Sequence, residues 1–228
     1  GTGVGIPVFS LKSKKSFGVG DFNDLQLLVD WAEKTGLKLI QVLPLNDTTG
    51  THTETDVLPY AAISAFALNP LFLHLPDIAK LPSSHPIAQE YKQLQPKLNN
   101  ESLVPFLDVI NFKMKYAHEA FLSQKDKFLK NKDFNLFFDN NKSWLAFCAL
   151  RDENETPDYR KWKNLSKFDL TQIEAFSKAD HPYFDTINTT YFIQYHLHLQ
   201  LQKAANYAHT KGVVLKGDIP IGVNRNSV

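Results

Sequence analysis

The chain has 228 residues, 43% of them hydrophobic and 12% aromatic, which is ample apolar material for a packed core and excludes a disordered chain. Its 25 Lys and Arg residues nearly balance 24 Asp and Glu residues, for a formal net charge of +1. No basic block could track a phosphate backbone, so we expect no nucleic-acid partner. The single cysteine, Cys148, lies among apolar residues and allows neither a disulfide framework nor a cysteine-rich metal site. A reducing, cytoplasmic compartment fits best.

The two ends of the chain carry no targeting or membrane signal. No apolar stretch approaches the roughly 20 residues that span a bilayer, and the first residues lack the charged-then-apolar pattern of a signal peptide. We therefore expect no membrane partner, while the oligomeric state stays open. The first residue is Gly1 rather than methionine, and no terminal element is recognisable before Val228. We expect both ends to be cuts within a longer protein.

The first periodic segment predicts a helix followed at once by a strand. Apolar residues recur at helical spacing over residues 21–36, and Gly36 is a typical helix stop because glycine accepts a positive φ. Residues 37–43 then form a short, nearly continuous apolar run that Pro44 closes. Such a run is typical of a strand buried on both faces of a parallel sheet.

A second segment far along the chain repeats this layout. Residues 190–212 predict a helix with one apolar face, and residues 213–219 predict a buried strand closed by Pro220. Helix, glycine, buried strand and polar loop make up the αβ unit of a parallel sheet. The repetition predicts an α/β fold, either a barrel or a doubly wound sheet, and the pattern alone does not separate the two.

The region between these segments, residues 77–181, is rich in aromatic residues and dotted with lysines. Its apolar spacing predicts helices over 106–122 and 140–150, while residues 82–100 have the composition of an exposed linker. These helices are too numerous for one crossover of a barrel, so we expect an inserted helical subdomain. The expected divisions are residues 1–76, 77–181 and 182–228.

The loop after the first predicted strand is the first candidate for chemistry. In parallel sheets and barrels, functional groups collect after the carboxyl ends of the strands. Residues 46–56 are dense in hydroxyl, carboxylate and amide groups, which suit sugar hydroxyls, and Tyr60 could stack on a sugar ring. An ordinary solvated loop has the same composition, so the residues alone leave both interpretations open.

The second candidate is Asp218, near the carboxyl end of the second predicted strand. An ionised carboxylate in an apolar run is costly unless it is paired, so we expect a buried partner, an arginine. An active-site carboxylate and a structural ion pair fit this reasoning equally well.

Other chemical groups give weaker signals. His196 and His198 lie two residues apart on a predicted helix and so face different ways, which argues against a shared metal. Gly18 and Gly20 lack the third glycine of a dinucleotide-binding loop, and we interpret them as a turn before the first helix. We expect no metal and no cofactor.

Several long motifs, in order along the chain, resemble the catalytic domain of 4-α-glucanotransferases, the amylomaltase or disproportionating-enzyme family (glycoside hydrolase family 77). They lie at residues 5–13 (GIPVFSLKS), 16–25 (SFGVGDFNDL), 41–48 (QVLPLNDT), 59–70 (PYAAISAFALNP) and 217–221 (GDIPI). Within the family, residues 51–53 and 216–218 look like the larger type that carries starch-binding modules ahead of the barrel. The family often has serine before the Pro-Tyr pair, where this chain has Leu58.

The resemblance implies a partial (β/α)₈ barrel, about its first three strands, with an inserted α-helical subdomain. It implies a parent enzyme that transfers α-1,4-glucan segments between malto-oligosaccharides or soluble glucans by a retaining double displacement, which needs two carboxylates. The family's nucleophile and acid/base belong to later strands, so we expect no catalytic residue within residues 1–228 and an inactive chain. An α-amylase-type hydrolase and a non-catalytic glucan-binding fragment remain as alternatives.

The resemblance also implies which residues contact substrate. Tyr60 would be an aromatic sugar contact, and Asp218 would orient its neighbours near the cleaved bond rather than attack it. The remaining candidates are loop-shaping or glucan-contacting groups: Asn46, Asp47, Asp56, Ser64 and Asn69.

Overall fold

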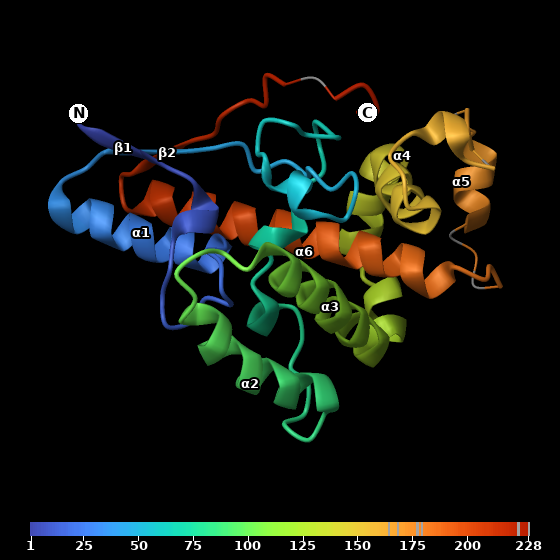
Figure 1. Cartoon of the computed structure of the whole chain (residues 1–228), viewed down its shortest axis with the longest axis horizontal. Coiled ribbons are helices and arrows are strands. Elements are labelled where there is room, and N and C mark those ends of the chain that lie inside the picture. The colour runs from blue at the N-terminus through green and yellow to red at the C-terminus, as the bar shows by residue number, and fades with distance from the viewer. Residues whose placement is uncertain (164, 168, 177, 179, 223, 228) are drawn as a thin grey trace.

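The computed structural model describes residues 1–163, 165–167, 169–176, 178, 180–222 and 224–227. A small sheet lies beside long helices, with α1 and α6 running along one side of it (Figure 1). In these described parts no helix is both long enough and apolar enough to cross a bilayer. The helices are α1 (Phe22–Thr35), α2 (Pro86–Asn99), α3 (Phe106–Leu129), α4 (Lys132–Asn154), α5 (Leu170–Phe176) and α6 (Phe184–Thr210).

Within the described residues, the sheet has three parallel strands in chain order. They are β1 (Gly3–Ile6), β2 (Leu39–Val42) and β3 (Val214–Lys216). The register pairs Ile40 of the central strand with Val4 on one side and Leu215 on the other. Parallel pairing requires long crossovers, which α1 and the long region up to α6 supply. Strand β1 was not predicted from the sequence, because its alternating glycines give no apolar run.

Helix α1 confirms the prediction for residues 21–36, and its ends show why. Asp21 is the N-cap: its side chain accepts from the backbone N–H groups of Asn23 and Asp24, and the Asp24 side chain accepts from the N–H of Asp21, which completes a capping box. At the other end Gly36 adopts a φ of 77°, the left-handed conformation that stops a helix.

The expectation that both strands are buried on two faces is wrong. Residues of β2 alternate between half-buried and buried, and β3 is mostly exposed, with Val214 at 58%. The helices cover one face of the sheet, so only the side chains that point to them are removed from water. Strand β3 is also shorter than predicted, because the backbone leaves the sheet after Lys216.

Residues 82–100 are not a linker, because most of them form α2. His85 caps this helix, Pro86 stands in its first turn where a missing N–H costs nothing, and Ile87 and Leu98 are buried. Helix α3 begins at residue 106 as predicted and runs beyond residue 122 to Leu129. Helix α4 extends beyond the predicted segment 140–150 at both ends.

Helix α6 is the centre of the packing. It begins at Phe184, earlier than the predicted start near residue 190, and it contacts α1, α3 and α4. Apolar side chains of all four helices join one continuous core with the sheet. The separation of residues 77–181 as a subdomain stays a prediction.

Candidate functional site

Tyr60 and Asp218, which lie 158 residues apart, meet at the carboxyl edge of the sheet. The Tyr60 hydroxyl donates to Asp218 Oδ2 at 2.9 Å, from the loop after β2 to the segment after β3. Both side chains are half-buried. The hydrogen bond to the carboxylate raises the pKa of Tyr60, because ionisation would place two negative charges side by side. The structure therefore pairs two residues that sequence reasoning singled out separately.

The expected arginine partner of Asp218 is wrong. Among the described residues its side chain binds Tyr60 and the backbone N–H of Ile219 at 3.0 Å, and its half-exposed position removes the need for a buried cation. The buried arginine pairs with another candidate. Arg151 of α4 donates from Nη1 to Asp47 Oδ2 at 2.5 Å, and both side chains are fully enclosed.

The segment after Asp218 passes directly over the Tyr60 loop, which comprises residues 46–67. At Gly222 an added Cβ would lie 2.3 Å from the carbonyl oxygen of Tyr60, far inside van der Waals contact. Farther on, Arg160 Nη2 donates to Asn226 Oδ1 at 3.2 Å. Only glycine, which has no side chain, allows the backbone of residue 222 to approach Tyr60 this closely.

The Asp47 backbone ties together the outgoing and returning legs of the loop. Its N–H donates to Ala67 O at 2.8 Å, and its C=O accepts from Ile63 N at 2.9 Å. Its carboxylate also accepts from the N–H of Thr49. Carboxylates of Asp152 and Asp47 raise the pKa of Arg151 well above its ordinary value, against the opposing effect of burial, so the guanidinium stays charged.

Asp56 closes the tip of the loop. Its buried carboxylate accepts from the backbone N–H groups of Thr51 and His52 and from the Thr51 hydroxyl. Its backbone oxygen accepts from the Thr48 hydroxyl at 2.6 Å, and Thr48 in turn accepts from Asn69 Nδ2 at 3.0 Å. These contacts shape the loop from within.

Asn46 and Ser64 fix the base of the loop. The Asn46 amide donates to the carbonyl oxygens of Ser64 and Ala65, and the Ser64 hydroxyl accepts from the N–H groups of Phe66 and Ala67. Five of the seven candidate side chains therefore have hydrogen-bond partners inside the loop or on α4. Tyr60 and Asp218 bind each other across the two segments.

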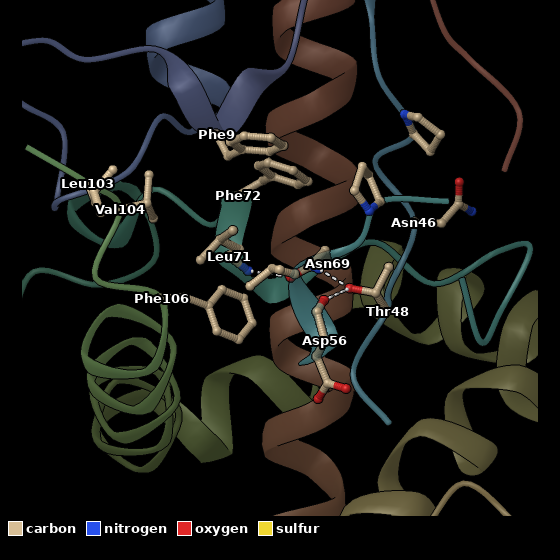
Figure 2. A pocket seen from close by; sticks show the side chains of 13 residues that line it. Phe9, Asn46, Thr48, Asp56, Asn69, Leu71, Phe72, Leu103, Val104 and Phe106 are labelled. Atoms are coloured by element: carbon tan, nitrogen blue, oxygen red, sulfur yellow. Dashed lines mark hydrogen bonds between the residues drawn. The ribbon is translucent and has the colours of Figure 1, made fainter. Parts of the chain in front are cut away.

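A pocket of about 320 Å³ lies beside the loop base (Figure 2). Thr48 and Asn69 form part of its polar side, with the Thr48 hydroxyl between Asn69 and the Asp56 backbone (Figure 2). Pro59, next to Tyr60, lines it, whereas Tyr60 itself does not. The apolar side is formed by Phe9, Leu71, Phe72, Leu103, Val104 and Phe106.

Comparison with known proteins decides the family. The sequence profile of 4-alpha-glucanotransferases (glycoside hydrolase family 77) matches residues 6–228. The chain belongs to the 4-α-glucanotransferase family. It is 41% identical over its whole length to the 4-alpha-glucanotransferase DPE2 of Oryza sativa subsp. japonica, of which it covers 24%. It is 31% identical to the 4-alpha-glucanotransferase of Chlamydia muridarum, of which it covers 42%. The chain thus spans less than half the length of these relatives.

Solved structures show the same fold. Over 99% of this chain, an amylomaltase from Streptococcus agalactiae in complex with acarbose matches with a TM-score of 0.71 at 20% identity, and the match covers 44% of that protein. An amylomaltase from Corynebacterium glutamicum matches with a TM-score of 0.73 at 18% identity, over 31% of its chain. The arrangement of strands and helices is therefore that of the corresponding part of amylomaltases.

In this member of the 4-α-glucanotransferase family, side chains that were not predicted from the sequence hold the segment that follows the loop. Lys113 Nζ donates to the carbonyl oxygens of Leu71 and Leu73, at 2.6 and 2.8 Å. Gln194 and Gln200 of α6 each bind the backbone of one further residue in the same segment. The sequence did contain a sign of the Lys113 contact, because a lysine within the apolar face of a helix needs buried hydrogen-bond acceptors.

The weaker candidates of this family member, His196 and Cys148, lie in packed surroundings and not in a site. His196 contacts the rings of Phe128 and Phe192, and burial lowers its pKa to about 4. Burial raises the pKa of the Cys148 thiol, which disfavours the reactive thiolate. Within the part of the chain that the structure describes, no group of three His, Cys, Asp or Glu side chains could hold a metal.

Proposed function

We propose that this chain supplies the part of a 4-α-glucanotransferase that contacts the glucan beside the cleaved bond, through Tyr60 and Asp218. The observation that carries this proposal is their 2.9 Å hydrogen bond at the carboxyl edge of a parallel sheet, where such folds place their sites. A half-exposed aromatic ring next to a carboxylate offers a sugar both a stacking face and a hydrogen-bond acceptor. Family membership supports a malto-oligosaccharide or soluble α-glucan as the ligand.

The proposed reaction of the parent enzyme is a retaining transfer. A carboxylate attacks the anomeric carbon, a second carboxyl group protonates the departing oxygen, and a sugar hydroxyl then takes up the glucosyl chain. In this proposal Asp218 orients substrate hydroxyls and its own geometry is held by Tyr60. Neither residue forms the covalent bond, so the 228-residue chain alone is expected to release no glucose from maltose above a heat-inactivated sample.

The proposed roles of the other five candidates are in shaping the loop. Asp47, Ser64 and Asn69 are buried and hydrogen-bonded to protein groups, and Asp56 holds the loop tip. Asn46 lines the pocket in Figure 2 and is half-buried where the other four are buried, so it is the best of them for a direct sugar contact.

We also propose that the three strands are the first three of a (β/α)₈ barrel and that residues 77–181 are an insertion in it. Parallel strands in chain order, with α1 and α6 on one face, support the barrel. A longer form of the protein in which β3 gains a fourth parallel neighbour would satisfy this proposal. A fourth strand paired antiparallel to β3 would contradict it.

The cytoplasm is the proposed compartment. The single cysteine is free and buried, which suits a reducing environment. Fractionation of the source cells with an antibody against this chain tests the assignment, and recovery of the protein outside the cytoplasm would contradict it.

Native gel electrophoresis with and without glycogen tests the glucan contact. We expect the wild-type chain to be retarded by glycogen, Tyr60→Ala to lose the retardation, and Tyr60→Phe to keep part of it because the ring remains. Tyr183→Ala is the matched control, since Tyr183 is 51% exposed at the start of α6. Wild-type protein that is not retarded, or Tyr60→Ala that is retarded equally, would contradict the proposal.

A further inference from the structure

The most enclosed ion pair of the chain's described part joins helix α4 to the Tyr60 loop. The Arg151 and Asp47 side chains are 3% and 0% exposed. Arg151 also donates to Asp152 Oδ1 from Nε and Nη2, at 2.8 Å each. Its guanidinium is therefore held by a carboxylate of α4 as well as by Asp47 of the loop. Removing two charges from water is costly, and such a pair stabilises little beyond that cost. Because the carboxylate and the guanidinium must meet in one orientation, the pair constrains how the loop lies on the helix.

The surrounding contacts show which geometry is selected. Ile63 and Ala67 of the loop pack on Phe147, Cys148 and Leu150 of α4 in a small apolar cluster. Apolar contacts are not directional, so they hold the loop against the helix without setting its rotation or register. The ion pair is directional, because the carboxylate must meet the guanidinium edge.

The backbone connects this pair to Tyr60. Asp47 accepts from the N–H of Ile63, three residues after Tyr60, and donates to Ala67. A rotation of Asp47 away from Arg151 would therefore move the leg of the loop that carries Tyr60. The connection between the ion pair and Tyr60 is short: it runs from Arg151 to Asp47 through the ion pair, from Asp47 to Ile63 through a backbone hydrogen bond, and from Ile63 back along three residues to Tyr60.

We propose that Arg151 and Asp47 are positioning residues for the glucan contact, because their ion pair sets the loop on α4 in the orientation in which Tyr60 meets Asp218. The positioning is a property of the chain itself, while its consequence for glucan binding rests on the proposed function. The pair acts through the loop and does not touch the sugar.

Two readouts separate these statements. The first is the titration of Tyr60, followed by NMR of chain labelled with ¹³C at tyrosine Cζ and assigned with Tyr60→Phe. Asp218 raises the pKa of Tyr60 in the wild-type chain. We expect Asp47→Asn, which keeps the shape and removes the charge, to return the Tyr60 titration toward the ordinary tyrosine range. The second readout is calorimetric affinity for maltoheptaose, which we expect to fall about tenfold, a loss of about 1.4 kcal/mol.

Controls make the result specific to this pair. Glu174→Gln breaks a more exposed ion pair, between Glu174 of α5 (54% exposed) and Lys142 of α4 (26% exposed), and should change neither readout. The double variant Asp47→Asn with Arg151→Met removes the two buried charges together and keeps the test available if the single variant does not fold. Asp152 then keeps His52 of the loop, 3.5 Å away, as its partner. Both variants are expected to unfold cooperatively and to show the shifted Tyr60 titration.

The outcomes are distinct. If the folded Asp47 and double variants keep the wild-type titration of Tyr60, the positioning role is overturned even where maltoheptaose binds. If their Tyr60 titration shifts but the wild-type chain does not bind maltoheptaose, the positioning role stands and the proposed function fails.

Discussion

Gln200 of α6 holds both backbone hydrogen-bonding groups of His74. Its Oε1 accepts from the His74 N–H at 2.8 Å and its Nε2 donates to the His74 C=O at 3.0 Å. Gln194, six residues earlier, holds Leu68 in the same way, at 2.9 and 2.8 Å. At each end of the segment after the Tyr60 loop, a glutamine side chain makes the two backbone hydrogen bonds that a neighbouring strand would make. Helix α6 therefore fixes the position of this segment along the helix.

Replacing Gln200 with leucine is expected to destabilise the chain by about 2 kcal/mol or more, because two buried backbone groups lose their partners. Gln200 is 7% exposed, so water does not substitute. Urea unfolding measures the loss. Gln89→Leu, at an exposed position of α2, should change the free energy of unfolding by less than about 0.5 kcal/mol. Equal losses in the two variants would show that the hydrogen bonds of Gln200 to His74 do not contribute to the free energy of unfolding.

Lys113 should make the chain more stable as the pH rises. Burial lowers the pKa of Lys113 from 10.5 to about 8, against the opposing effects of Asp21 and Asp24. Between these values the unfolded chain binds more protons than the native chain, so the free energy of unfolding rises with pH, by at most about 1.4 kcal/mol per pH unit.

The comparison of wild type with Lys113→Met isolates this contribution. The variant leaves the carbonyl oxygens of Leu71 and Leu73 without their donor and should be less stable at every pH. Its stability should lack the rise above pH 8 that the wild type shows. Urea unfolding at a series of pH values below 10 measures both slopes, and parallel slopes would refute the assignment.

His196 should make the chain less stable as the pH falls below neutral. Its pKa in the native chain is lowered by burial to about 4, below the model-compound value of 6.5. As the pH falls from 6.5 to about 4, His196 becomes protonated in the unfolded chain but not in the native chain, so the free energy of unfolding decreases. His196→Phe should lose less stability than the wild type in thermal unfolding between these pH values, while His209→Gln, at an exposed position of α6, should follow the wild type. A wild-type pH slope in His196→Phe would contradict this.

Gly222→Ala should separate Tyr60 from Asp218. A Cβ at this position would lie 2.3 Å from the Tyr60 carbonyl oxygen, so the segment after β3 must move away. The Tyr60 titration is then expected to return to the ordinary tyrosine pKa of about 10. Gly217→Ala is the matched control, because its Cβ would meet nothing within 4 Å. An unchanged titration in Gly222→Ala would show that the segment adjusts without loss of the hydrogen bond.

Local patterns predicted the elements whose signals are local. The helix at α1 followed from apolar spacing, Asp21 and Gly36, all within one stretch of chain. Strand β1 was missed because its hydrogen-bond partner, Leu39 onward, lies far along the chain and its own residues alternate with glycine. Helix α2 was taken for a linker because its polar residues face water, and only Ile87 and Leu98 show that one face is buried.

The family and the candidates Tyr60 and Asp218 could be recognised from the chain's residues alone, because motifs and residue types are readable without distances. The partners of these residues could not: Asp218 pairs with Tyr60 rather than an arginine, and Arg151 pairs with Asp47, 104 residues away. Charge pairing depends on distances between side chains that are remote along the chain. Those distances are set by how α4 and α6 pack against the loop and the sheet, which no local pattern contains.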